Sequence, residues 1–598
     1  MRTFLTLSAA VLLPALCLAA GHGDQLNPTG DPIGGGPGYR DVKSPQQAAF
    51  VVGNKAELIE VLRKARPGMV VYVRDEATID MTGADDQTIP GGVTLASGRG
   101  RDGSQGALVY SGSLTDEAKF IPLFKTGGKG VRVTGLRLRG PLAEIGDHHY
   151  DQIKIANGLR ADHKDLEVDN CELWAWNKWA IDLAVAGGAR VHHNYIHHTR
   201  RWGYGYGVWV RGGGKALIEA NLFDFSRHHI GSGAQADSSY EARYNICLEH
   251  DVQPSFDRHG SAEKAGASTL IHHNEFRNAD EPAILLRGNP LVEARFHDNW
   301  FYHANDAAAF RIKPWVKKNC FVYDNHFGPL PASCHPTAQG TATPLAGPAP
   351  LAVSLDASAS HDNEGGRIVG YRWNFADTPD AVGPEAFGRT AQYTFKEPGR
   401  YLVGLTVSNE RGIPTTDWLP VTVLPPQGGY VLSAWVKDSY YGPLKGYYRK
   451  QILIDGNVIW EDDVEGDEGG WQHVVLDVGR WVQGKREVDL AFRLQADKDV
   501  TDPAKQIVEC YLYADDVYLF GGTVKAGDFE SDDGWVFEQQ PAGDAGFRIA
   551  TSNLWRGEAR SGKRCCVLGN SHGRKIQAGA YTQVKQRVAI AERPAAPR

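Results

Sequence analysis

Basic side chains recur at similar places in successive segments of the chain between residues 206 and 313. Arg211, His259, Arg287 and Arg311 each close a short strand-like segment, and Lys313 lies two residues beyond Arg311. Residues two apart on a strand share a face, so we expect Lys313 beside Arg311. If the segments stack, the pattern predicts one column of positive charge that faces solvent.

Such a column suits β-elimination from a uronic acid. The sugar carboxylate must be neutralised before the C5 proton leaves, because the developing enolate would otherwise repel it. A base then removes the proton, and an acid protonates the leaving oxygen. The candidate bases are Arg287, His259 and His229, and the candidate acids are Tyr206 and His259. We therefore predict a lyase whose partner is an acidic polysaccharide.

The segment 227–259 is the least repetitive part of this region, and it has polar residues where a scaffold would use aliphatic ones. Departures of this kind tend to mark functional sites. We add Asp257 to the candidate catalytic residues. The predicted substrate-binding residues are Arg211, His228, Glu241, Arg258, Arg311 and Lys313.

Two other functions stay open. A glycoside hydrolase needs two carboxylates about 5–9.5 Å apart. The candidate pairs are Asp257 with Glu241 and Asp257 with Asp251. A non-catalytic adhesin or matrix protein needs only a glycan-binding surface. An unsaturated uronide in the product indicates a lyase, and new reducing ends without it indicate a hydrolase. No other cofactor is expected, but Ca²⁺ could bridge substrate carboxylates, with Asp162, Asp165 and Asp169 as its candidate ligands.

One Asn-centred phrase recurs along the first half of the chain. The shared asparagine falls at 170, 194, 221, 245, 274, 299 and 325, so successive repeats are 24 to 29 residues apart. Each repeat alternates apolar and polar residues, which is strand periodicity. A fixed period of this length predicts a solenoid, in which the asparagines bond up and down the stack. These asparagines are expected to be scaffold.

A helical pattern precedes the coils. Lys55–Ala65 has helical spacing with Asn54 as its N-cap, and a helix there would plug the open end of a solenoid. Together with the repeats, the segments 89–96 and 131–140 resemble the pectate-lyase superfamily over residues 50–330. The resemblance implies a right-handed parallel β-helix at 21–335. The Arg-x-Pro-x-x-Arg spacing and the Trp-Ile-Asp-His segment of pectate lyases are absent, so pectate is not implied as the substrate.

Two further modules are expected after an Ala/Thr/Pro/Gly-rich linker. The segments 355–360, 370–375, 393–401 and 403–409 resemble a polycystic-kidney-disease (PKD) β-sandwich at 340–425, a type that usually acts as a spacer. The segments after 429 resemble the later half of a carbohydrate-binding jelly roll, and those after 526 resemble its earlier half. We predict one circularly permuted jelly roll at 427–592. The fold class is therefore all-β, a parallel β-helix with C-terminal β-sandwich modules.

The chain begins with a charged, apolar and small-residue pattern typical of a secretory signal peptide at residues 1–20. Secretion or periplasmic export is therefore expected. The 598 residues carry a net charge of −7, which argues against nucleic acid as a partner. No later stretch approaches the roughly 18 apolar residues of a membrane span. We expect a monomer.

Overall fold

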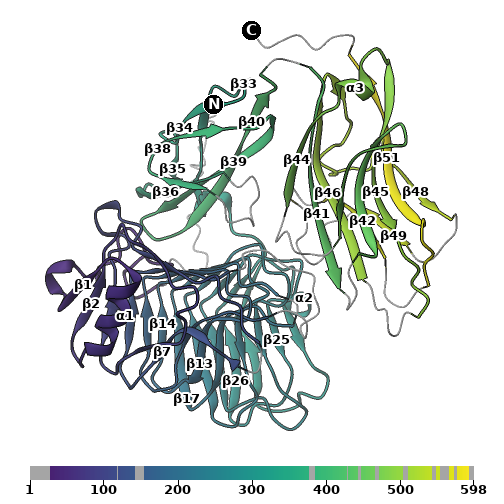
Figure 1. The fold of residues 1–598 in the computed structure, drawn as a ribbon. Helices are drawn as coiled ribbons and strands as arrows, with labels where there is room; N and C mark the ends of the chain where they lie inside the picture. Colours follow the sequence, from purple (N-terminus) through teal and green to yellow (C-terminus); the bar gives the residue numbers. More distant parts are fainter. Residues whose placement is uncertain are drawn as a thin grey trace, which may run out of the picture.

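The computed structural model describes residues 27–591 except 117–118, 142–153, 202, 376–383, 427–428, 442–445, 465–470, 503–508, 542–546, 552–559, 561–563 and 571–574. The expected signal peptide lies outside the described residues. A β-solenoid and two β-sandwiches follow one another along the chain (Figure 1). The all-β prediction is confirmed. No helix in the described part of the chain has the length and apolarity to cross a membrane.

The solenoid consists of three parallel sheets to which successive coils add strands. Sheet 1 comprises β1 (Phe50–Val52), β2 (Val70–Val73), β5 (Thr94–Ala96), β8 (Arg132–Thr134), β11 (Glu167–Asp169), β14 (Arg190–His192), β17 (Gly214–Glu219), β20 (Ser238–Arg243), β23 (Ser268–His272), β26 (Glu293–His297) and β29 (Cys320–Tyr323). Sheet 2 comprises β3 (Thr78–Asp80), β6 (Leu108–Tyr110), β9 (Arg137–Arg139), β12 (Glu172–Trp174), β15 (Tyr195–His197), β18 (Leu222–Asp224), β21 (Ile246–Cys247), β24 (Glu275–Phe276), β27 (Trp300–Phe301) and β30 (His326–Phe327). Sheet 3 comprises β4 (Gln87–Ile89), β7 (Pro122–Thr126), β10 (Asn157–Arg160), β13 (Trp179–Val185), β16 (Tyr206–Gly212), β19 (His228–Ser232), β22 (Phe256–Arg258), β25 (Ile284–Leu286) and β28 (Phe310–Ile312).

Apolar side chains stack from coil to coil in the interior of the solenoid. Pairing in sheet 1 aligns one fully buried residue from each of six successive strands. Burying each Val or Ile side chain contributes about 1.5–3 kcal/mol, so the stack is a large part of the driving force for folding. The aligned residues are Val168, Val191, Ile218, Ala242, Ile271 and Phe296.

The repeated asparagines form the predicted ladder at the turn between sheets 1 and 2. From Asn194 to Asn325, each asparagine donates its backbone N–H and its side-chain amide to the side-chain oxygen of the next, at 2.8–3.1 Å. These bonds satisfy polar groups that would be costly to bury alone. Asn170 differs, because its side chain instead accepts from the Gly36 amide and donates to the Arg99 carbonyl.

Helix α1 (Lys55–Lys64) lies at the first end of the solenoid, as predicted (Figure 1). The Asn54 side chain accepts a hydrogen bond from the Glu57 amide and so caps the helix. Leu58 and Leu62 are fully buried against the first coil, which closes the apolar interior at this end.

The first sandwich has a three-stranded and a five-stranded sheet beside one small strand pair. The strands are β31 (Pro336–Thr337), β32 (Thr341–Thr343), β33 (Ala346–Pro348), β34 (Leu351–Asp356), β35 (His361–Asp362), β36 (Ile368–Asn374), β37 (Glu385–Phe387), β38 (Thr390–Phe395), β39 (Gly399–Asn409) and β40 (Pro414–Leu424).

This sandwich packs against sheet 2 of the solenoid through partly buried ion pairs. Glu172 of β12 accepts a hydrogen bond from Arg137 at 2.6 Å and lies 3.4 Å from Arg372 of the sandwich. Arg137 in turn lies 3.2 Å from Glu385 of the sandwich. Ile413 completes the contact by packing against apolar residues of sheet 2. The module is thus packed directly against the solenoid.

The second sandwich forms from two chain segments that pair with each other. Its strands are β41 (Val431–Tyr441), β42 (Tyr448–Ile454), β43 (Asn457–Asp463), β44 (Gln472–Asp477), β45 (Glu487–Ala496), β46 (Glu509–Phe520), β47 (Gly522–Thr523), β48 (Val536–Gln540), β49 (Phe547–Thr551), β50 (Cys566–Asn570) and β51 (Tyr581–Ile590). β51 is central beside β45, and β50 lies beside β46. The segments 429–523 and 526–592 therefore share one sandwich, as the permuted arrangement requires.

Candidate functional site

The predicted column of basic residues lies on sheet 3. The backbone amides of His259, Arg287 and Lys313 each donate to a carbonyl of the preceding coil at 3.0 Å. This ladder places the three side chains in one column, one residue past the ends of β22, β25 and β28. Arg211 belongs to the same column two coils earlier, because Val210 pairs with Ser232, which pairs with Arg258.

The position predicted for Arg311 is wrong. Arg311 pairs with Leu285, which pairs with Asp257, so it lies in the neighbouring outward column. The short helix α2 (Asp306–Ala309) explains the shift, because a helix advances only about 1.5 Å per residue and takes up more chain before β28. Lys313, and not Arg311, follows Arg287.

A buried carboxylate at Asp257 organises this face. Arg287 donates to both of its oxygens, at 2.8 and 2.6 Å, in a bidentate contact. The Nε2 atom of His259 lies 3.0 Å from Oδ2, and that of His228 lies 3.4 Å from it. Burial raises the pKa of Asp257, but the His259 hydrogen bond, the electrostatic interactions with His228 and His259 and the Arg287 hydrogen bond outweigh burial and hold the pKa well below its usual range. The carboxylate is therefore ionised.

Tyr206 joins this group from the preceding coils. Its hydroxyl lies 3.2 Å from Nε2 of His259 and accepts a hydrogen bond from Nη1 of Arg227 at 3.3 Å. Burial raises the pKa of Tyr206 even though Arg227 opposes the rise, so the phenol keeps its proton. We call Tyr206, Asp257, His259 and Arg287 the outer cluster.

The contacts of the outer cluster determine which nitrogen of His259 is available. Nε2 faces the ionised Asp257 and therefore carries the hydrogen, which leaves the lone pair on Nδ1. No hydrogen bond to Nδ1 is recorded within the described part of the chain. The His259 and Arg287 side chains are 34% and 33% exposed, whereas Asp257 is fully buried. A solute can thus reach the histidine and the arginine but not the carboxylate.

A second arginine–carboxylate pair lies beside the outer cluster. Arg211 donates to both oxygens of Asp182, at 2.9 and 2.5 Å, and the Asp182 side chain is only 2% exposed. Burial outweighs the effect of Arg211 and raises the pKa of Asp182. Neither Asp182 nor Arg227 was predicted as a site residue from the sequence. An aspartate within the apolar strand Trp179–Val185 was the available signal for the first.

His229 does not belong to the outer cluster. It is fully buried and stacks on Phe223 of the solenoid interior, with ring centroids 5.3 Å apart. Burial lowers its pKa to about 3. A neutral histidine enclosed in the interior cannot take a proton from a polysaccharide, so the predicted role as base is wrong. The adjacent His228 is also fully buried and supports Asp257 from behind, which excludes direct substrate contact.

Two other predicted residues lie outside the outer cluster. Arg258 is buried in the solenoid interior, where it donates to the carbonyls of Ser238 and Ala265. Glu241 belongs to β20 of sheet 1 and pairs with Lys215 and Arg243. The substrate-binding roles of Arg258 and Glu241 are therefore wrong. Because strand residues alternate between faces, the predicted Arg258 points opposite to its neighbours Asp257 and His259.

The carboxylate pairs proposed for a hydrolase do not face one open site. Asp257 lies on sheet 3 and Glu241 on sheet 1. Asp251 is buried, and its carboxylate accepts hydrogen bonds from Ser255 and Asn278. Burial raises its pKa to about 7. Neither pair can flank a glycosidic bond in the way that a hydrolase requires.

Aromatic rings continue the site along sheet 3. Phe120 stacks on Trp179 at 5.8 Å, and Trp179 stacks on Trp209 at 6.1 Å, with interplanar angles of 12° and 6°. The Arg211 guanidinium lies over Trp179 at 4.6 Å. The ring faces cover one another, so this stack stiffens the surface.

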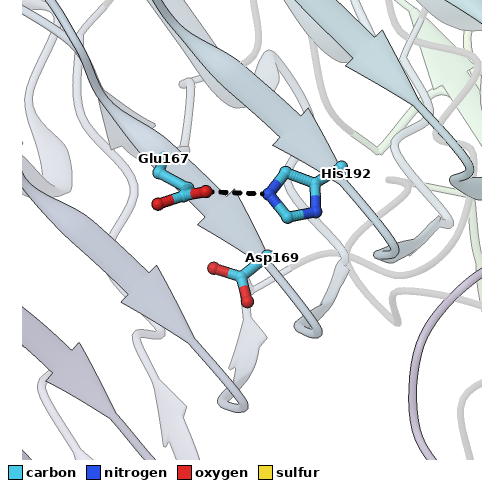
Figure 2. A group of neighbouring side chains, drawn as sticks. All are labelled: Glu167, Asp169 and His192. Carbon is cyan, nitrogen blue, oxygen red and sulfur yellow. Dashed lines mark hydrogen bonds and ion pairs between the residues drawn. The ribbon is translucent and has the colours of Figure 1, made fainter. Parts of the chain in front are cut away.

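One of the predicted calcium ligands, Asp169, belongs to a group of three possible metal ligands on sheet 1. Ligand atoms of Glu167, Asp169 and His192 all lie within 4.8 Å of one another, and Figure 2 shows Glu167 directed toward His192. Asp169 is already an acceptor for both Arg132, at 2.7 Å, and the Tyr39 hydroxyl, at 2.9 Å. These partners neutralise the carboxylate, so the group is a hydrogen-bonded ion-pair network.

The other two predicted calcium ligands do not join Asp169. Asp162 pairs with Arg160 at 2.8 Å, and Asp165 occupies a left-handed turn position with φ of 60°. Neither belongs to the group around Asp169. The three aspartates thus do not form one cation site.

Comparison with known proteins identifies one module. Residues 334–423 match the family model described as the PKD domain, which confirms the type predicted for the first sandwich. No curated protein sequence matches the chain.

Three solved structures show limited similarity. An alginate lyase from Paenibacillus sp. str. FPU-7 is 13% identical, with 47% of this chain and 100% of that chain covered and a TM-score of 0.33. Carbohydrate-binding modules of the β-sandwich superfamily are 16% identical, with 44% and 94% covered and a TM-score of 0.15. The Dettilon tailspike protein is 10% identical, with 92% and 93% covered and a TM-score of 0.22.

Proposed function

We propose that this protein is a polysaccharide lyase that cleaves a uronic-acid-containing chain by β-elimination at the outer cluster. One observation carries the proposal: a tyrosine, a histidine and an arginine converge on an outward face around one buried, ionised carboxylate. His259 and Arg287 present a base and a fixed cation to one sugar residue, and Tyr206, which is only 3% exposed, supplies the acid from behind His259.

Arg287 binds the substrate carboxylate in this proposal. Its Nε and Nη2 atoms are held by Asp257, which leaves Nη1 for a ligand. Burial disfavours the charged guanidinium, but the Asp257 hydrogen bond outweighs burial and raises the pKa of Arg287. Arg287 therefore stays a cation, which suits charge neutralisation and not proton abstraction.

His259 removes the C5 proton through Nδ1. Asp257 orients the ring and stabilises the imidazolium that forms, as a carboxylate does for a catalytic histidine. The electron pair of the C5–H bond then forms the C4–C5 double bond, and the C4–O bond breaks. The Tyr206 hydroxyl protonates the leaving oxygen, and solvent exchange restores both groups.

The test is the ultraviolet absorbance of an unsaturated uronide when the purified protein is incubated with a panel of acidic polysaccharides. We expect activity in the wild type and a loss of about 10²–10⁴-fold in kcat for His259→Ala and Tyr206→Phe. His361→Ala, an exposed histidine of the first sandwich, is the matched control. It should retain full activity.

Other outcomes separate the remaining functions. New reducing ends without the unsaturated product would overturn the lyase proposal in favour of a hydrolase. Glycan binding without any cleavage would favour an adhesin. Full activity in both His259→Ala and Tyr206→Phe would show that the outer cluster is not the catalytic site.

The same proposal includes the context in which the enzyme acts. We propose an exported monomer whose solenoid belongs to the pectate-lyase superfamily and whose second sandwich binds carbohydrate. A secretory signal at 1–20 and the Asn-centred repeats support this. N-terminal sequencing of the exported protein should start near Gly21, and light scattering should give the mass of one chain.

A further inference from the structure

A cavity of about 500 Å³ lies between the solenoid and the first sandwich. One wall comes from sheet 2 and the turns after it, and the other from the five-stranded sheet that contains β36, β39 and β40. Residues of the segment 33–37 and Arg99 also line the cavity. This volume lies within the range of about 300–1,000 Å³ that is common for small-ligand sites. The outer cluster lies on sheet 3, so the cavity is a separate feature.

The solenoid wall combines a ring surface with polar groups. The rings of Phe225 and His250 stack at 4.1 Å with an interplanar angle of 7°. His250 Nδ1 lies 3.0 Å from a carboxylate oxygen of Asp224. The side chains of His250 and Glu249 are 43% and 51% exposed, although both line the cavity. This wall therefore presents acceptors and a donor to a ligand.

The sandwich wall also combines aromatic rings with polar groups. Tyr371 and Trp418 contribute aromatic rings to it, and both are partly exposed. The hydroxyls of Thr406 and Thr416 lie 2.8 Å apart on the neighbouring strands β39 and β40. Rings that provide apolar contact beside hydroxyls and carboxylates match a sugar, whose C–H faces and hydroxyl edges need both.

The charges of the cavity are balanced. Its arginines Arg277 and Arg372 are held by carboxylates, Arg277 by Glu275 at 2.7 Å and Arg372 by Glu172 at 3.4 Å. A third arginine, Arg99, also lines the cavity, and its Nη1 atom donates to the Gly34 carbonyl at 2.9 Å. Three carboxylates, Glu172, Asp224 and Glu249, line the cavity as well. Three arginines and three carboxylates thus line the cavity, so their charges cancel and the lining favours a neutral ligand.

The two modules are fixed on both sides of the cavity. The Glu172–Arg372 ion pair lies at one edge and the apolar contact of Ile413 at another. Walls that are already held apart lose little freedom when a ligand binds, which favours affinity.

We propose that this cavity binds a short neutral oligosaccharide segment between the solenoid and the PKD-type sandwich. This binding site goes beyond the proposed lyase activity and does not depend on it. The PKD-type module then contributes directly to glycan recognition.

The test is isothermal titration calorimetry of the full chain with cellotetraose, mannotetraose, xylotetraose and, as the acidic probe, tetragalacturonate. At least one neutral probe should bind with a dissociation constant of about 1 mM or tighter. Trp418→Ala should weaken that binding about tenfold by removing one ring. Thr416→Trp should abolish it, because Thr416 is exposed and the larger ring fills the cavity.

Two controls complete the experiment. His361→Ala removes an exposed ring of the first sandwich that does not line the cavity, and it should leave binding unchanged. Arg287→Lys should also leave it unchanged, which separates this site from the outer cluster. The proposal is overturned if none of the neutral probes binds, if binding survives in Thr416→Trp, or if tetragalacturonate binds in the cavity more tightly than the neutral probes.

Discussion

Asp257→Asn is the most informative perturbation of the outer cluster, because one carboxylate holds both Arg287 and His259. Asp182→Asn is its matched control. Asp182 is nearly as buried and makes the same bidentate contact with an arginine, but it has no histidine partner among the described residues. The pair of variants separates loss of an ion pair from loss of histidine orientation.

The expected cost in stability follows from these contacts. Removing one partner of a buried ion pair costs about 3–5 kcal/mol. Arg287 and Arg211 remain 33% and 26% exposed, so water replaces part of the interaction. We expect Asp257→Asn to lower the free energy of unfolding by about 2–3 kcal/mol after this discount. Asp182→Asn should cost less, because burial already raises the pKa of Asp182 and brings its neutral form closer in free energy.

Urea unfolding and initial rates of uronide formation measure the two effects separately. An asparagine at 257 no longer fixes the hydrogen on Nε2 of His259, so kcat should fall about 10²–10⁴-fold. Asp182→Asn should change KM through Arg211 and leave kcat intact. Equal losses of kcat in both variants, or full kcat in Asp257→Asn, would refute the proposed orientation of His259.

Three further predictions concern the solenoid. Asn245→Ala breaks the middle of the ladder and should cost about 3 kcal/mol in urea unfolding, against about 1 kcal/mol for Asn325→Ala at its end; equal costs would contradict the ladder as a source of stability. His229→Phe should raise the free energy of unfolding by about 1–2 kcal/mol, because it replaces a buried polar imidazole by an apolar ring that can keep the stacking contact. It should leave kcat unchanged, and a fall in kcat would indicate that His229 is the base after all. Burial raises the pKa of Asp251 to about 7, so the folded chain keeps a proton that the unfolded chain releases near pH 4. The free energy of unfolding should therefore fall as the pH rises from about 4 to about 7, by up to about 4 kcal/mol. Asp251→Asn should remove that fall, and identical stability–pH curves for variant and wild type would contradict the assignment.

The local patterns of the sequence were sufficient to predict most of the fold. The helix at Lys55–Lys64, the turn asparagines and the alternating strands are local signals, and each is confirmed. The pairing of segments 429–523 and 526–592 also followed from segment order. The attachment of the first sandwich to sheet 2 was missed, since the Glu172–Arg372 contact joins residues 200 positions apart.

For the site, the sequence determined which residue types line sheet 3, and periodicity aligned Arg211, His259 and Arg287. Only the tertiary structure decided which side chains turn outward and which charges are already paired. A one-residue difference in direction separates the interior Arg258 from the outer His259, and a short helical turn separates Arg311 from the column. Residue spacing predicted a row of cations, but in the structure Arg211 and Arg287 are each paired with a buried carboxylate. These partners come from other coils, so no local pattern in the sequence indicates them.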